Sequence, residues 1–287
     1  AAMKLNSYLA MKYYLPGAPE STDYPEETDV LYTSSQLGFS RNAWGGKTKT
    51  VVGVHGGYNM DSGCQVDIGN FFYEYKGVVF ADDPGIENYA LPPTAYPCRA
   101  EGANVWVVNP DASYGQSLKG YGDINMKESK PDGVIYTLDL SSAYNGYVKS
   151  ALRGYMLSED RTVFTVQDEI KPYRRENDFY WFWHTLADIT VNENSRSVSL
   201  ARNGVVCKIY FDSNVDFTIT KQDVLTSLPG SPVVEGQNQM PHAAKMHKIV
   251  VNFQSSGEPI IFRATAVPFG KNIDRDTLAP ISEWTIP

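Results

Sequence analysis

Hydrophobic and polar residues alternate with a period of two along most of the chain from residue 30 onward. This period is typical of β-strands, in which successive side chains point to opposite faces of a sheet. The segments that show it are 30–33, 37–40, 50–54, 70–76, 78–81, 105–108, 134–138, 147–155, 162–170, 179–185, 197–202, 205–211, 215–219, 248–253 and 259–267. Many short strands separated by turn residues predict an all-β protein, built as a large antiparallel β-sandwich.

Two turn signals and one aromatic strand add detail to the predicted sandwich. Lys76-Gly77 and Asn203-Gly204 each separate two alternating runs by two residues, and glycine there accepts the positive φ of a hairpin turn. Segment 179–185 is aromatic on both faces, which predicts a central strand between two layers.

The two ends of the chain depart from the alternation. Residues 4–15 carry apolar side chains at helical spacing and predict a short N-terminal helix, followed by a Pro-rich linker. Residues 226–245 lack any period and predict a long loop. We therefore divide the chain into helix and linker (1–29), a sandwich domain (30–225), and a C-terminal part (226–287). The strands of this last part either complete the sandwich or form a small C-terminal β extension.

Composition and charge narrow the function classes. The chain has 287 residues, 42% of them hydrophobic, which suits a globular protein of about one large domain. The net charge of −8 argues against nucleic acid or an acidic membrane surface as the partner. No apolar run approaches the roughly 20 residues needed to cross a bilayer. No signal-peptide core follows the opening Ala1-Ala2-Met3, which we interpret as a cloning remnant on a fragment of a longer protein.

The cysteines give no framework for a disulfide-rich fold. There are three, Cys64, Cys98 and Cys207, and none falls in a Cys-x-x-Cys metal pattern. A disulfide between Cys64 and Cys98 would join two loops of the stretch from His55 to Asn104. The sequence leaves open whether these two cysteines are bonded or free.

The stretch from His55 to Asn104 gathers polar residues at the ends of predicted strands. A Gly-rich loop leads into a strand, a two-residue turn and a second strand that ends in Asp82-Asp83, and an Arg/Glu/Asn cluster follows. Polar residues collected at strand ends are where β proteins usually place a site. The alternative is a set of surface turns, in which Asp82 and Asp83 cap backbone groups.

Several positions of this stretch keep a recognisable order: Gly56, Gly57, Asp67, Gly69, Phe71, Asp83, Gly85, Arg99 and Asn104. A second ordered set comprises Asp139, Tyr144, Val148, Lys149, Arg153, Asp168, Glu169, Trp183, His184 and Thr185. Together they resemble the motifs of the heparinase II/III-like polysaccharide lyases, in their C-terminal β-sandwich domain. The similarity covers residues 30–215.

The resemblance implies a supersandwich of the galactose-mutarotase-like kind, a secreted or periplasmic location and a polysaccharide partner. The family cleaves uronate-containing polysaccharides by β-elimination, which needs neutralisation of the uronate charge, a base and an acid. Its members carry an N-terminal α/α toroid domain that supplies part of the active site. This chain has no counterpart of the toroid, which we expect in the full-length protein.

The chemical positions of the family motif are substituted here. The catalytic histidine falls on Gly63, and the metal-binding residues fall on Gln65, Asp83 and Ala103. Asp83 alone is a good metal ligand, and one carboxylate does not hold zinc. We therefore expect no cofactor, with a divalent metal at Asp83 as the alternative, and no lyase activity from the chain alone.

Candidate site residues come from the same stretch. His55 is the candidate catalytic residue because it is the histidine nearest the loop. The candidate substrate-binding residues, whose rings, amides and charged groups suit sugars, are Tyr58, Asn59, Asp61, Gln65, Arg99, Glu101 and Asn104. His184 is expected in the core, and His242 and His247 at the solvated surface.

Two functions remain in competition. In the first, the chain is the β-sandwich domain of a lyase homologue that acts on or binds uronate-containing polysaccharide and is inactive by itself. In the second, it is a non-catalytic carbohydrate-binding or structural sandwich module. Because fold analogy alone does not establish function, the geometry of the candidate residues has to separate the two.

Overall fold

The computed structural model of the protein describes residues 27–44, 49–59, 65–85, 92–237, 241–271, 273, 275 and 277–286. They form an all-β structure with large antiparallel sheets, as the period of two predicted. The expected N-terminal helix, most of the linker, and the positions Asp61, Gly63 and Cys64 lie outside the described residues.

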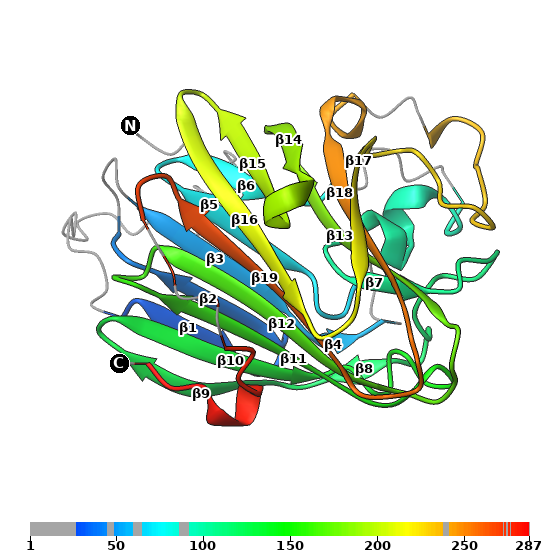
Figure 1. Cartoon of the computed structure of the whole chain (residues 1–287), viewed down its shortest axis with the longest axis horizontal. Coiled ribbons are helices and arrows are strands. Elements are labelled where there is room, and N and C mark those ends of the chain that lie inside the picture. Colours follow the sequence, from blue (N-terminus) through cyan, green and yellow to red (C-terminus); the bar gives the residue numbers. More distant parts are fainter. Residues whose placement is uncertain are drawn as a thin grey trace, which may run out of the picture.

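The strands form four sheets (Figure 1). In spatial order, the five-stranded sheet contains β1 (Asp29–Tyr32), β2 (Leu37–Arg41), β3 (Thr50–His55), β5 (Phe71–Tyr75) and β6 (Val78–Ala81). The eight-stranded sheet contains β14 (Asp188–Asn192), β15 (Ser197–Arg202), β16 (Val205–Ser213), β19 (Ile260–Pro268), β12 (Val163–Pro172), β11 (Val148–Ser158), β10 (Gly133–Asp139) and β9 (Ile124–Lys130). The four-stranded sheet contains β17 (Phe217–Asp223), β18 (His247–Gln254), β13 (Asp178–Thr185) and β7 (Trp106–Val108). A two-stranded sheet pairs β4 (Gly57–Tyr58) with β8 (Tyr121–Gly122).

Helical structure in the described part of the chain is limited to single 3-10 turns. They are η1 (Tyr96–Cys98), η2 (Ala100–Gly102), η3 (Glu193–Ser195), η5 (Ala243–Lys245) and η6 (Ile281–Glu283). None of these turns is long and apolar enough to pass through a membrane. The turns η1 and η2 matter for the site, because they carry the segment that follows β6 back beside the ends of β5 and β6.

The sheets form two layers around one aromatic core. The eight-stranded sheet is one layer, and the five- and four-stranded sheets meet at β6 and β13 to form the other. Between the layers, the ring centroids of Phe71 and Phe164 lie 5.5 Å apart, and those of Trp181 and Phe262 lie 5.2 Å apart. Such rings bury much apolar area each, so they hold the two layers together.

The predicted strands and both hairpin turns are confirmed. Each segment predicted from the alternation corresponds to a strand of the structure. Lys76 and Gly77 have φ values of 54° and 76°, and Asn203 and Gly204 have 50° and 75°. Two successive positive φ values are typical of the type I′ turn, whose twist matches that of the flanking strands.

The alternation does not predict β9 and β14, which form the two edges of the eight-stranded sheet. Strand β9 is polar over most of its length, and Ile124 is its one fully buried side chain. Charged side chains on edge strands limit unwanted pairing with other chains. The hydrophobic signal is therefore weakest where the strand has a neighbour on one side only.

The C-terminal strands lie inside the sheets, so the expected small β extension is wrong. Strand β18 lies between β17 and β13, and β19 lies between β16 and β12. The physical reason is the apolar face of β19, because Ile260, Phe262, Ala264 and Ala266 are all fully buried in the main core. Of the two arrangements considered for residues 226–287, the strands complete the sandwich.

A buried ion pair fixes the loops of the motif stretch onto the eight-stranded sheet. Arg153 in β11 donates two hydrogen bonds of 2.7 Å to the carboxylate of Asp168 in β12. The same guanidinium donates to the carbonyls of Gly69 and Asn104 at 2.8 and 2.9 Å. Charge-assisted bidentate pairs have strict geometry, so this pair sets where the two loops lie.

Candidate functional site

Three neighbouring strands form an aromatic row on the outer face of the five-stranded sheet. Phe39 in β2 lies opposite Gly53 in β3, and Gly53 lies opposite Phe72 in β5. Adjacent residues such as Val52 and Phe71 are buried in the core, so the strand alternation directs Phe39 and Phe72 outward. Both of these outward rings are half-buried.

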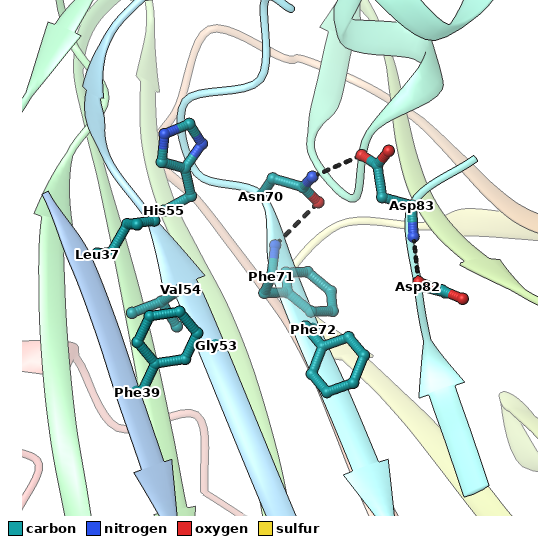
Figure 2. A pocket seen from close by; sticks show the side chains of 10 residues that line it. All are labelled: Leu37, Phe39, Gly53, Val54, His55, Asn70, Phe71, Phe72, Asp82 and Asp83. Carbon is teal, nitrogen blue, oxygen red and sulfur yellow. Dashed lines mark hydrogen bonds between the residues drawn. The ribbon is translucent and has the colours of Figure 1, made fainter. Parts of the chain in front are cut away.

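One step further along the same strands, the outer face becomes polar. His55 ends β3 and donates its backbone N–H to the carbonyl of Asn70 at 3.0 Å, while Asp82 and Asp83 follow β6. The aromatic row and these polar residues line an open pocket of about 170 Å³ (Figure 2). In Figure 2 the polar side chains of His55, Asn70 and Asp83 lie along one end of the pocket, and the aromatic rings lie below them.

His55 forms an imidazole–carboxylate pair at this polar end. Its Nδ1 lies 3.3 Å from Asp67 Oδ1, and the side chains of His55 and Asp67 are 38% and 12% exposed. The backbone N–H of Asp67 donates to the side-chain carbonyl of Asn59 at 3.2 Å, which holds the carboxylate in place. A carboxylate at Nδ1 fixes the orientation of the ring. An imidazole held in this way can exchange a proton or bind a sugar hydroxyl.

Asp83 is tied into the polar end by hydrogen bonds. Its Oδ2 accepts the side-chain amide of Asn70 at 2.8 Å, and its Oδ1 accepts the backbone N–H of Gly85 at 2.6 Å. Burial raises the pKa of Asp83 to about 6, and the negative charges of Asp67 and Asp82 add to this effect. The carboxyl group therefore changes its charge close to neutral pH.

Arg99 and Glu101 lie in a buried ionic network behind the pocket. Arg99 is 2% exposed and Glu101 0%. The Arg99 guanidinium donates to Glu101 Oε2 at 2.6 Å and to Ser231 Oγ at 2.7 Å, and Lys248 Nζ lies 3.6 Å from Glu101 Oε1. Burial lowers the pKa of Lys248 to about 8, although the charge of Glu101 opposes the effect. This geometry makes both predicted substrate-binding residues supports of the loops rather than part of an accessible surface.

Asn104 is fully buried as well and connects that network to the pocket. Its side-chain carbonyl accepts the backbone N–H of His184 at 2.7 Å and the ring Nδ1–H at 3.1 Å, and its amide donates to the carbonyl of Asp82 at 2.8 Å. His184 Nε2 accepts the Tyr96 hydroxyl at 2.9 Å. Burial and the charge of Lys248 hold the pKa of His184 well below its usual value. The prediction of a core histidine is confirmed.

The remaining predicted residues lie around the pocket rather than in it. Tyr58 is 38% exposed, whereas Asn59 is 6% exposed and donates its amide to the side chain of Gln116 at 3.0 Å. Neither lines the pocket, and Asp61 lies outside the described residues. Of the residues predicted from sequence, His55 and Asp83 line the pocket, and the half-buried Gln65 approaches it through Asp83.

Sequence reasoning missed the aromatic half of the pocket. Phe39, Gly53 and Phe72 read as ordinary strand residues, and Asn70 as the start of a strand. A signal was present in the alternation: Phe71 occupies the core phase of β5, so the phenylalanine beside it must point outward. A large aromatic ring at an outward position is the pattern that identifies such a row.

The residues at the family's metal positions do not fit a metal ion. Ala103 has no ligand atom, and the side-chain nitrogen of Gln65 lies 3.5 Å from Asp83 Oδ1, where it can only donate. Asp83 already accepts N–H groups from Asn70 and Gly85. Within the described ranges, no three His, Cys, Asp or Glu side chains gather as a metal-binding group. Asp83 is thus the one strong ligand at the family's metal positions, and one carboxylate does not form a zinc site.

Solved structures of heparinase III and of a heparan sulfate lyase are similar to this chain. The heparinase III structure aligns with a TM-score of 0.66 at 15% identity, over 92% of this chain and 39% of that one. A mutant of the heparan sulfate lyase HepC from Pedobacter heparinus aligns with a TM-score of 0.69 at 12% identity, over 88% of this chain and 38% of that one. No family model and no curated protein matches the sequence.

The structural likeness confirms the resemblance read from the motifs at the level of the fold. The chain spans well under half the length of the solved structures it matches. At identities this low the likeness establishes a shared architecture, and function has to be argued from the site.

Proposed function

We propose that the chain is the β-sandwich domain of a heparinase II/III-like polysaccharide lyase homologue, and that it binds uronate-containing polysaccharide. The observation that carries this proposal is the convergence of the motif loops. His55, Asp67, Asn70 and Asp83 come together at one end of the five-stranded sheet, beside an open pocket. The fold shared with a heparan sulfate lyase supports a polysaccharide as the ligand class.

The proposal includes the absence of lyase activity in the chain by itself. β-Elimination needs a cationic group at the uronate carboxylate, together with a base and an acid. Glycine and alanine stand at two positions where the family has histidine, and the described lining of the pocket includes no lysine or arginine. Arg99 and Lys248 are buried behind it. His55 remains the candidate base in a complete active site.

The wider setting follows from the same proposal. We infer a helical toroid domain beside this sandwich in the full-length protein, a secreted or periplasmic location, and a supersandwich of the galactose-mutarotase-like kind. The net charge of −8 favours neither nucleic acid nor an anionic membrane as a partner. We expect no metal to take part, because Asp83 is the one carboxylate at the family's metal positions, and Gln65 and Ala103 stand at the other two.

Affinity electrophoresis tests the binding function. The chain is run through native gels that contain heparan sulfate, hyaluronan, alginate or pectate, with dextran as a neutral control. We expect retardation in at least one uronate-containing gel relative to a gel without polysaccharide. Unchanged mobility in all of them would overturn the binding proposal and leave a structural module, the second of the two competing functions.

An absorbance assay tests the predicted inactivity. Lyases leave an unsaturated uronate at the new chain end, which absorbs in the ultraviolet. We expect no growth of absorbance when the chain is incubated with the polysaccharide that retards it. Growth that disappears in a His55→Ala variant would show that the chain is an enzyme and that His55 takes part in the reaction.

A further inference from the structure

The pocket owes its shape to a glycine that the backbone does not require. Gly53 is absent from the residues with positive φ, so its conformation is open to other amino acids. A Cβ at this position would lie 3.2 Å from Phe39 Cε1 and 3.6 Å from Phe72 Cβ. Because Gly53 has no side chain, the Phe39 ring lies against the backbone of β3, and Figure 2 shows Phe39 and Phe72 on the two strands that flank β3.

The size and walls of the pocket restrict what it can hold. Its volume of about 170 Å³ is below the roughly 300–1,000 Å³ of sites for drug-sized ligands, so it suits one small ring. Phe39 and Phe72 offer apolar faces against which the C–H groups of a pyranose ring can pack. His55 and Asp83 at the polar end offer hydrogen-bond partners for hydroxyl groups.

The charges around the pocket select among sugars. Asp82 and Asp83 line it, and Asp67 lies behind His55. His242 Nε2 lies 3.9 Å from Asp82 Oδ2, so the second nearby imidazole is also beside a carboxylate. The described lining includes no lysine or arginine to neutralise an anion. A carboxylate or sulfate on the sugar would be repelled here, whereas neutral hydroxyls can donate to Asp83.

We propose that this pocket is a subsite for one uncharged pyranose ring of the polysaccharide, packed between Phe39 and Phe72 with its hydroxyls on His55 and Asp83. The inference rests on the proposed polysaccharide-binding function and deepens it. The uronate residues of the same polymer then lie outside the pocket, next to the ring that occupies it.

Saturation-transfer NMR titrations with four methyl glycosides test this assignment. The probes are methyl glucoside and methyl glucuronide, and methyl galactoside and methyl galacturonide, which differ within each pair at C6 only. At pH 7.5 we expect at least one neutral glycoside to bind, and its uronide to bind on the order of tenfold more weakly. Equal or tighter binding of the uronide, or no binding of any of the four, would overturn the inference.

Three variants locate the binding. Phe72→Ala removes one ring and should weaken neutral glycoside binding about three- to tenfold. Gly53→Val introduces a residue that strands favour at the place where the Phe39 ring now lies, and should displace this ring and abolish binding. Val51→Ala is the matched control, because Val51 lies two residues from Gly53 on the same face and does not line the pocket. Thermal unfolding identifies any variant that fails to fold, and Phe72→Ala decides the case if Gly53→Val fails.

The same variants separate this inference from the proposed function. Suppose that a uronate-containing gel retards the unchanged chain, and that it retards the Gly53→Val and Phe72→Ala variants as strongly as the unchanged chain. The polysaccharide then binds outside the pocket. The proposed function then stands and the subsite is wrong. If the unchanged chain is not retarded in any gel, the proposed function fails first.

Discussion

Two polar regions of this protein lie next to each other and differ in their access to water. The pocket end keeps His55 38% exposed, and its carboxylates are in reach of a ligand. The ionic network behind it keeps Arg99, Glu101 and Lys248 at 2% exposure or less. Both regions come largely from one stretch of sequence. Polar residues of a single motif block thus divide into those that can meet a ligand and those that hold the loops.

The difference in exposure determines what each region tolerates. A buried charge must keep its partners, because desolvation penalises any charge left alone. A partly exposed charge can exchange a protein partner for water or a sugar hydroxyl at little cost. Substitutions in the network should therefore act on stability, and substitutions at the pocket should act on binding.

The largest expected effect follows from Glu101→Gln. This change leaves the buried cations of Arg99 and Lys248 without their shared carboxylate. We expect the free energy of unfolding to fall by about 3–5 kcal/mol, measured by urea denaturation. The matched control is Glu74→Gln, which removes a carboxylate paired with Lys49 at 2.8 Å near the surface. It should cost about 1 kcal/mol or less, and equal losses in both variants would erase the distinction between the two regions.

Asn104→Ala should have the next largest effect. The side chain makes four hydrogen bonds of 3.1 Å or less, two of them to His184, and all would be lost. We expect a loss of about 2–3 kcal/mol, because buried partners remain unsatisfied. Asn125→Ala removes one exposed contact of 3.5 Å and serves as the control. A loss below that of the control would show that Asn104 does not hold the loops.

The sequence predicts the strands of this fold better than the contacts between them. The period of two is a local property, and it locates every strand with a strong apolar face, including β13 and β19. The burial of Arg99 and Glu101 depends on distant partners: Ser231 is 132 residues from Arg99, and Leu228 is 127 residues from Glu101. No local pattern encodes such a contact, so polar residues of a core network resemble residues of a binding site.

The same limit explains the mixed outcome for the candidate site. His55 and Asp83 line the pocket because strand ends on one sheet meet at the same edge, which topology predicts. The aromatic row is invisible in sequence until the core phase of each strand is known. Phe72 is then distinguished from Phe71 only by the direction of its side chain.

The pH dependence of stability gives a smaller effect with a definite sign. Because the pKa of Asp83 is raised to about 6, the folded protein holds a proton between pH 4 and 6 that the unfolded chain has released. The free energy of unfolding should therefore fall as the pH rises through this window, by about 1–2 kcal/mol for this partly exposed group. An Asp83→Asn variant should lose that part of the slope in urea denaturation measured from pH 4 to 7. An unchanged slope would mean that Asp83 titrates normally.

The smallest effect on stability, together with a clear effect on binding, is expected for His55→Ala. The imidazole pairs with Asp67 at 3.3 Å and is 38% exposed, so its loss should change the free energy of unfolding by about 0.5 kcal/mol. His247→Ala is a close control, because His247 Nδ1 lies 3.2 Å from Asp223 Oδ1 and the residue does not line the pocket. In affinity electrophoresis the His55 variant should lose part of its retardation, and the His247 variant should keep it. Equal retardation of both variants would place the ligand away from the polar end of the pocket. The pocket end would then not be a binding region, and only the supporting role of the buried network would stand.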